Sequence, residues 1–220
     1  EQYIINARII DPKNQIDEIG GLIIDEKGLI KAKGKSVSNG NIPNSVEKLD
    51  LKKNILIPGL VDLRVFVGEP GFEYKENFRT LSQAALAGGV TSIVTMPNTK
   101  PIIDNVSMVD FIIRRGRDKA KVNLFPCASM TRQNEGNQMT EFGLLKARGI
   151  IGFTDVNKTI QNTELMSRIM NYASDIDVLI MQHAEDYELS KNSCINEGEV
   201  ATRLGLQGVS DIAEKIIIER

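Results

Sequence analysis

The strongest constraint on the fold of this chain is an alternation of strand and helix patterns that begins at residue 54. Continuous apolar runs cover residues 55–67, 91–96, 122–128, 150–153 and 178–181, and helix-like stretches near 75–87, 105–117, 138–148 and 161–174 alternate with them. Short continuous apolar runs are typical of strands buried on both faces. Strands separated by helices are expected to be parallel, which predicts an α/β barrel or an open doubly wound sheet.

The first 53 residues have a different pattern. Short β-rich segments at Tyr3–Ile10, Gly21–Asp25 and Leu29–Lys33 are broken by turn sequences and followed by a polar stretch, residues 35–44. This pattern predicts a small β module at residues 1–53, followed by an α/β domain at residues 54–220.

The second domain holds fewer strand–helix units than a closed barrel contains. About five units and a last helical segment, residues 210–220, follow residue 54. A complete eight-stranded barrel needs about 250 residues. We therefore expect the N-terminal part of a (β/α)8 barrel, truncated after about five units of a longer protein.

Composition excludes several classes of function. Of the 220 residues, 41% are hydrophobic and 25% charged, and a net charge of −2 gives no attraction to nucleic acid or to an anionic membrane. No apolar stretch approaches the ~20 residues of a membrane-spanning helix, and no basic-then-apolar leader is present. The basic residues at 114–121 end a predicted helix, so we interpret them as a solvated face. A cytoplasmic protein is expected.

Histidine and cysteine are too scarce for many metal sites. His183 is the only histidine, and Cys127 and Cys194 lack the spacing of a zinc knuckle or a redox pair. Both cysteines are expected to be free thiols. His183 ends an apolar run, where barrel enzymes place their sites, and either a structural or a site histidine is compatible with this position.

Several short motifs occur in the order and rough spacing of one protein family. They are Pro58-Gly59-Leu60-Val61-Asp62, Glu69-Pro70-Gly71, Met96-Pro97-Asn98-Thr99, Phe153-Thr154-Asp155 and His183-Ala184-Glu185-Asp186. Together they resemble bacterial dihydroorotases of the amidohydrolase superfamily. The resemblance covers essentially the whole chain and implies a (β/α)8 barrel with a small N-terminal β-sandwich module. The implied reaction is the reversible ring closure of N-carbamoyl-aspartate to dihydroorotate in pyrimidine synthesis.

The resemblance also implies a zinc site at the carboxyl ends of the barrel strands, but the first strand departs from it. The two first-strand histidines of the family fall on Arg64 and Phe66, and neither side chain binds a metal cation. The arginine that would hold the substrate carboxylate falls on Gly68. Half of the implied metal site and one substrate contact are therefore absent.

Later strands keep part of the implied site. The strand-four pair of aspartates falls on Asp155 and Val156, while the strand-five histidine and the substrate-side asparagine are retained as His183 and Asn98. If the site is retained, His183 and Asp155 are its metal ligands and zinc its cofactor; otherwise no cofactor is expected. Asp155 is equally explained as a cap or loop carboxylate, and Asn98 as a turn residue.

Arg64 suggests a replacement for the missing metal. A permanently charged guanidinium at the mouth of the first strand is expected to pair with Asp155, so that no unpaired carboxylate is buried there. A surface arginine is the alternative. Phe66, on the same face, is expected to fill volume that ligands and water would need.

The expected function is that of a catalytically degenerate dihydroorotase-like protein. The run from Arg64 to Gly71 resembles inactive family members that associate with aspartate transcarbamoylase, which implies a structural role in an oligomer. Two alternatives stay open. One is an active zinc-dependent dihydroorotase, or a related cyclic amidohydrolase, with a reduced metal site; the other is a small-molecule binding or sensor protein. No nucleic-acid or membrane partner is expected.

Overall fold

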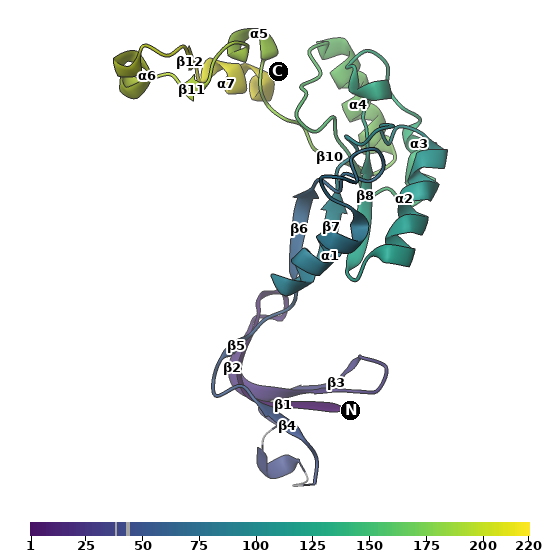
Figure 1. Cartoon of the computed structure of the whole chain (residues 1–220), viewed down its shortest axis with the longest axis vertical. Coiled ribbons are helices and arrows are strands. Elements are labelled where there is room, and N and C mark those ends of the chain that lie inside the picture. Colours follow the sequence, from purple (N-terminus) through teal and green to yellow (C-terminus); the bar gives the residue numbers. More distant parts are fainter. Residues whose placement is uncertain (38, 43–44) are drawn as a thin grey trace. The chain divides into compact units, whose positions relative to one another are not determined.

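A computed structural model describes residues 1–37, 39–42 and 45–220 and divides the chain into two compact units, Glu1–Gly59 and Leu60–Arg220 (Figure 1). The division lies later than residue 53 because β5 (Ile55–Leu56) pairs in parallel with β1 (Gln2–Asp11) of the first unit. The apolar run 55–67, expected as one strand, is therefore two strands in separate sheets. Pro58 and Gly59 separate β5 from β6 (Leu60–Val65), since proline cannot continue a ladder of backbone hydrogen bonds.

The first unit is built around the long strand β1. Strand β1 pairs with β2 (Ile16–Ile24), β4 (Lys48–Asp50) and β5. Strand β3 (Ile30–Gly34) pairs with the other edge of β2, which gives the sheet order β3-β2-β1-β4. Two short 3-10 turns, Pro12–Asn14 and Asn39–Asn41, connect them. The expected β-sandwich is, in the described residues, a single mixed sheet with a small core of Ile5, Val37 and Ile42.

The second unit has the predicted alternation of parallel strands and helices. Its sheet has the order β10-β9-β8-β7-β6, comprising β6, β7 (Val90–Thr95), β8 (Asn123–Ala128), β9 (Gly152–Phe153) and β10 (Leu179–Ile180). All four pairings are parallel. Strands that are neighbours both in sequence and in the sheet, with a helix between each pair, form part of a (β/α)8 barrel.

Four helices connect these strands: α1 (Phe78–Ala87), α2 (Val106–Lys119), α3 (Phe142–Ala147) and α4 (Thr163–Asp175). Asn77, Asn105 and Asn162 cap α1, α2 and α4, because each side chain accepts hydrogen bonds from backbone N–H groups of the first turn. Helix α3 begins later than residue 138, since Met139 forms a β-bridge with Thr131 instead.

The two faces of the parallel sheet bury different sets of side chains. The face toward the helices carries the main core, in which the rings of Phe142 and Phe153 stack with centroids 3.8 Å apart. A second cluster contains Val94, Met96, Cys127 and Val156, with Met181 packed against it. Because strand residues alternate in direction, we assign this second cluster to the face toward the barrel axis.

The last part of the chain consists of short elements. These are α5 (Tyr187–Ser190), β11 (Ile195–Asn196), α6 (Glu199–Leu204), β12 (Gly208–Val209) and α7 (Ile212–Glu219). Strands β11 and β12 pair in parallel, and the backbone N–H of Asp186 donates to the carbonyl of Ala213 at the start of α7. Among the described helices, none has the length and apolar character that crossing a bilayer requires.

Candidate functional site

A pocket of about 280 Å³ lies where strands β6, β7 and β9 end. We call it the barrel-mouth pocket. The side chains that line it are Arg64, Phe66, Met96, Asn98, Val156 and Asn157. The structure thus brings together four residues singled out from the sequence, Arg64, Phe66, Asn98 and Val156. Asp155 and His183 are not among the lining residues.

Asp155 faces away from the pocket into a network of hydroxyl groups. Its carboxylate is buried, with 1% of the residue exposed, and Oδ1 accepts hydrogen bonds from Ser129 Oγ at 2.7 Å and from the backbone N–H of Thr131 at 3.0 Å. The Thr131 hydroxyl donates to Oδ2. The charge is therefore stabilised by donors that follow β8. Val156, the other position of the strand-four pair, is the one that lines the pocket.

The prediction that Arg64 forms an ion pair with Asp155 is wrong. Arg64 is exposed, and its guanidinium donates from Nη2 to the side-chain oxygen of Asn157, two residues beyond Asp155. In the described part of the chain the two charges form no ion pair, because the donors from Ser129 and Thr131 already satisfy the carboxylate.

Replacing Asp155 with asparagine tests this structural role. We expect Asp155→Asn to lower the free energy of unfolding by about 1 to 2 kcal/mol, since its hydrogen bonds lose a charged acceptor. Urea unfolding measures the change, with the exposed Asp175 on α4 as a matched control, Asp175→Asn. Unchanged stability combined with a loss of bound zinc would instead identify Asp155 as a ligand.

His183 lies apart from the pocket-lining residues and pairs with an acid in its own segment. Its Nε2 lies 2.7 Å from Glu185 Oε2, and its backbone carbonyl accepts a hydrogen bond from Thr159 Oγ1 at 2.5 Å. Hydrogen bonding from the side chains of Ser190 and His183 lowers the pKa of the Glu185 carboxyl. These contacts give His183 a structural role in the segment after β10.

The side chains present do not fit the zinc site that the family resemblance implies. Within the described residues, no group of three or more His, Cys, Asp or Glu side chains could hold a metal ion. Cys127 lies in the cluster on the barrel-axis face, and burial raises the pKa of its thiol to about 12, so it stays protonated. Met96 and Val156 belong to the same apolar cluster, which offers a metal no oxygen or nitrogen ligand.

The Glu-Pro-Gly motif has a structural explanation. Glu69 is buried, and Arg115 on α2 donates from Nε to Glu69 Oε1 at 2.7 Å, while the backbone N–H of Phe78 donates to Oε2 at 3.2 Å. This carboxylate therefore joins the loop after β6 to α1 and α2. Arg115 was expected on a solvated basic face, and that expectation is wrong because its guanidinium pairs with Glu69.

Gly68 is held in a conformation that other residues rarely adopt. Its φ is +73°, and a Cβ atom added there would lie 2.5 Å from the carbonyl oxygen of Glu76 and 2.9 Å from that of Phe72. The position therefore requires glycine. An arginine side chain does not fit here with the loop in this conformation.

Two features of the site were not predicted from the sequence. Ser129 and Thr131 follow β8 at a spacing of two, and this spacing places both hydroxyls on one side of an extended segment. That signal was available. Asn157 gave none, since only the turn after β9 brings its amide to the guanidinium of Arg64.

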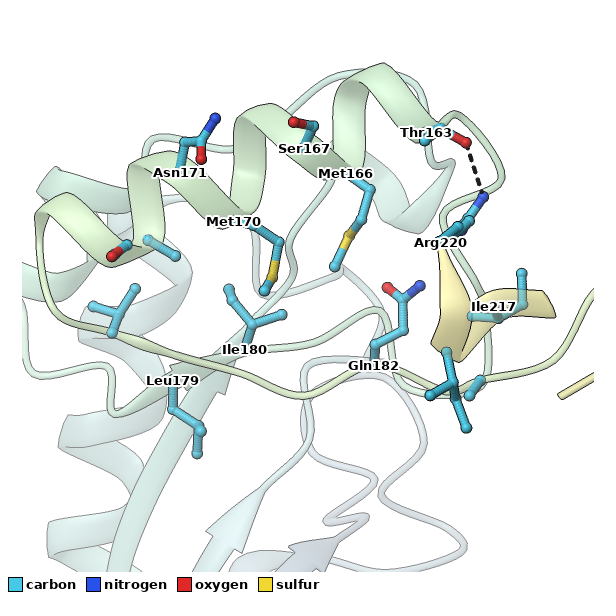
Figure 2. A pocket seen from close by; sticks show the side chains of 15 residues that line it. Thr163, Met166, Ser167, Met170, Asn171, Leu179, Ile180, Gln182, Ile217 and Arg220 are labelled. Atoms are coloured by element: carbon cyan, nitrogen blue, oxygen red, sulfur yellow. Dashed lines mark hydrogen bonds between the residues drawn. The ribbon is translucent and has the colours of Figure 1, made fainter. Parts of the chain in front are cut away.

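A larger pocket, of about 800 Å³, lies between α4, β10 and α7. Figure 2 shows Met166 and Met170 of α4 pointing toward Ile180 and Gln182. The one ionisable side chain in its wall is Arg220, which donates to the carbonyls of Ile160 and Gln161. A mostly aliphatic wall whose only charge is already hydrogen-bonded provides no acid or base for catalysis.

Comparison with known proteins agrees with this architecture. The protein-family profile described as "Dihydro-orotase-like" matches residues 53–220. The dihydroorotase of Syntrophus aciditrophicus is 42% identical over 97% of this chain and 50% of its own length, and that of Pelobacter propionicus is 41% identical over 99% and 50%. The chain thus spans about half the length of these curated relatives.

The structural comparison concerns the fold alone. The L-hydantoinase of Arthrobacter aurescens superposes with a TM-score of 0.70 and 17% identity, covering 86% of this chain and 42% of its own. The structural match agrees with the parallel sheet and its helices. The chain therefore belongs to the dihydroorotase-like family of the amidohydrolase superfamily.

Proposed function

We propose that this chain is part of a non-catalytic dihydroorotase-like protein that serves pyrimidine biosynthesis as a structural partner of aspartate transcarbamoylase. The observation that carries the proposal is the chemistry of the barrel-mouth pocket, where Arg64, Phe66 and Val156 occupy positions implied to hold metal ligands. A guanidinium repels a metal cation, and hydrocarbon side chains give it no ligand. Without an activated water molecule the family reaction has no nucleophile.

The structural role is supported by sequence resemblance. The run from Arg64 to Gly71 resembles that of family members that associate with aspartate transcarbamoylase. We therefore propose that the protein works in an oligomer.

Zinc content and enzymatic turnover test the loss of catalysis. The purified protein is expected to hold much less than one zinc ion per chain and to show no conversion of N-carbamoyl-aspartate or dihydroorotate above a blank. The variant His183→Ala is expected to behave identically in both measurements, because His183 pairs with Glu185. Sedimentation with aspartate transcarbamoylase is expected to show a complex.

The two alternatives give different results in the same experiments. About one zinc ion per chain, with turnover that His183→Ala abolishes, would establish an active cyclic amidohydrolase. A thermal shift with dihydroorotate or N-carbamoyl-aspartate, without turnover, would favour a sensor. Absence of a complex in sedimentation would rule out the structural partnership.

A further inference from the structure

We propose that the loop between β6 and α1 is a surface through which the protein contacts its partner, and that the partner offers an apolar slot with carboxylates at its rim. The loop, residues 71–75, carries Phe72, Tyr74 and Lys75, and we call it the aromatic loop. The assignment rests on the partnership with aspartate transcarbamoylase proposed above and names the side chains that make the contact.

The first observation is a group of aromatic rings that extends into solvent. The ring centroid of Phe72 lies 6.0 Å from that of Phe66 and 6.5 Å from that of Tyr74. Tyr74 is 79% exposed, the largest value among the exposed large hydrophobic side chains of the described residues. Tyrosine is enriched at interaction hot spots, because its ring supplies contact area at a small loss of conformational entropy. The loop therefore presents an aromatic platform to solvent.

The second observation is a positive charge on this platform. The ammonium of Lys75 lies 5.3 Å from the ring centroid of Phe72 and 5.7 Å from that of Tyr74, within the range of a cation–π interaction. Within the described residues, Lys75 forms no ion pair and donates no hydrogen bond. Lysine has three N–H donors and the rings accept none of them strongly, so the donors stay available to a partner.

The carboxylates of the same segment are satisfied internally. Both oxygens of Glu73 lie 3.0 Å from the backbone N–H of Gly71, which donates to them. Glu76 accepts a hydrogen bond from the hydroxyl of Thr80. In the described part of the chain, the uncompensated charge of the loop is therefore that of Lys75, and carboxylates of a partner are its complement.

The base of the loop is fixed, so the rings are held in one arrangement. Gly71 has a φ of +94°, and a Cβ atom added there would collide with the carbonyl oxygen of Lys100. The backbone N–H of Lys100 donates to the carbonyl of Pro70 at 3.0 Å, and that of Phe72 donates to the carbonyl of Gly68 at 2.6 Å. Contact residues that are already ordered lose less conformational entropy on binding. The loop is therefore suited to a specific contact.

A protein is the class of partner that these features favour. Aromatic side chains are enriched at the centres of protein interfaces, where a charge needs a complement on the other side. The net charge of −2 gives the chain as a whole no attraction to nucleic acid. The expected contact therefore places the ring of Tyr74 in an apolar slot and the ammonium of Lys75 against acidic side chains of the partner.

Affinity measurements on loop variants test the assignment. The full chain and its variants are titrated against aspartate transcarbamoylase of the same organism by biolayer interferometry. Tyr74→Ala is expected to weaken binding by about tenfold or more, whereas Tyr74→Phe, which keeps the ring, stays within about threefold of the wild type. Lys75→Gln is expected to weaken binding by about threefold to tenfold at low salt, and to make the affinity less sensitive to added salt.

Two matched variants on other elements provide the controls. Tyr187 on α5 is 65% exposed, and Lys119 on α2 is exposed as well. Tyr187→Ala and Lys119→Gln are expected to leave the affinity unchanged. Because Tyr74 and Lys75 are exposed, their variants are expected to fold normally, which thermal unfolding checks.

The outcomes separate the aromatic loop from the partnership itself. A complex of equal affinity with the wild type, Tyr74→Ala and Lys75→Gln would leave the partnership intact and exclude the loop from the interface. An equal loss in Tyr74→Ala and Tyr187→Ala would also overturn the assignment, because the effect would not be specific to the loop. Absence of any complex with the wild type would overturn the partnership and the assignment together.

Discussion

Replacing Arg115 with methionine is expected to lower the free energy of unfolding by about 3 to 5 kcal/mol. The variant removes the guanidinium that pairs with Glu69, whose side chain is only 5% exposed. The remaining donor to Glu69 is the backbone N–H of Phe78, at 3.2 Å. An unpaired buried carboxylate costs much more than the loss of an exposed ion pair. Urea unfolding monitored by circular dichroism measures the change.

The neighbouring arginine on the same helix provides the control. Arg114 is exposed, so Arg114→Met is expected to change the stability by no more than about 0.5 kcal/mol. The double variant Glu69→Gln/Arg115→Met removes both charges and is expected to recover part of the loss. If Arg115→Met were as mild as Arg114→Met, the ion pair would have no structural importance.

Gly68→Ala is expected to destabilise the protein by about 3 kcal/mol or more. An alanine at a φ of +73° is strained, at a cost of about 1 to 2 kcal/mol. The added methyl group would also lie 2.5 Å from the carbonyl oxygen of Glu76, which forces the loop backbone to move. Thermal and urea unfolding give the size of the effect.

Gly89 separates the two contributions. Its φ of +77° is close to that of Gly68, but no atom lies within 4 Å of the position of an added Cβ. Gly89→Ala is therefore expected to cost only the strain, about 1 kcal/mol. A similar loss in both variants would mean that the contact with Glu76 is unimportant.

The fold was largely predictable because the alternation of strands and helices is a local pattern of burial. Residues 91–96 and 122–128 were recognised as strands by their apolar runs, and they became the adjacent strands β7 and β8. The run 55–67 was harder to interpret. Pro58 and Gly59 mark a break in this run, but apolar character does not reveal which sheet each part joins. The pairing of Ile55 and Leu56 with β1 places β5 in the first unit.

The site was less predictable because its contacts join distant segments. Arg64 and Asp155 were correctly placed at strand ends, yet the partners of Asp155 come from the segment after β8. The hydroxyl of Ser129 reaches the carboxylate from a neighbouring strand end, whereas the guanidinium of Arg64 reaches Asn157. Which hydrogen-bond partner a side chain takes depends on geometry within a few ångströms, and the order of the strands does not determine that geometry.

Under the proposed non-catalytic role, the glycine at position 68 bears on how easily the family's chemistry could be gained by this chain. The resemblance implies that catalysis needs an arginine here, but the loop accepts no side chain until the backbone around Glu76 and Phe72 has moved. The first substitution on a path back to activity would therefore be harmful by itself, because it would weaken the fold before any ligand or substrate contact was regained. A gain of catalytic activity would require several substitutions together. The order in which these substitutions occur therefore decides whether activity can be gained.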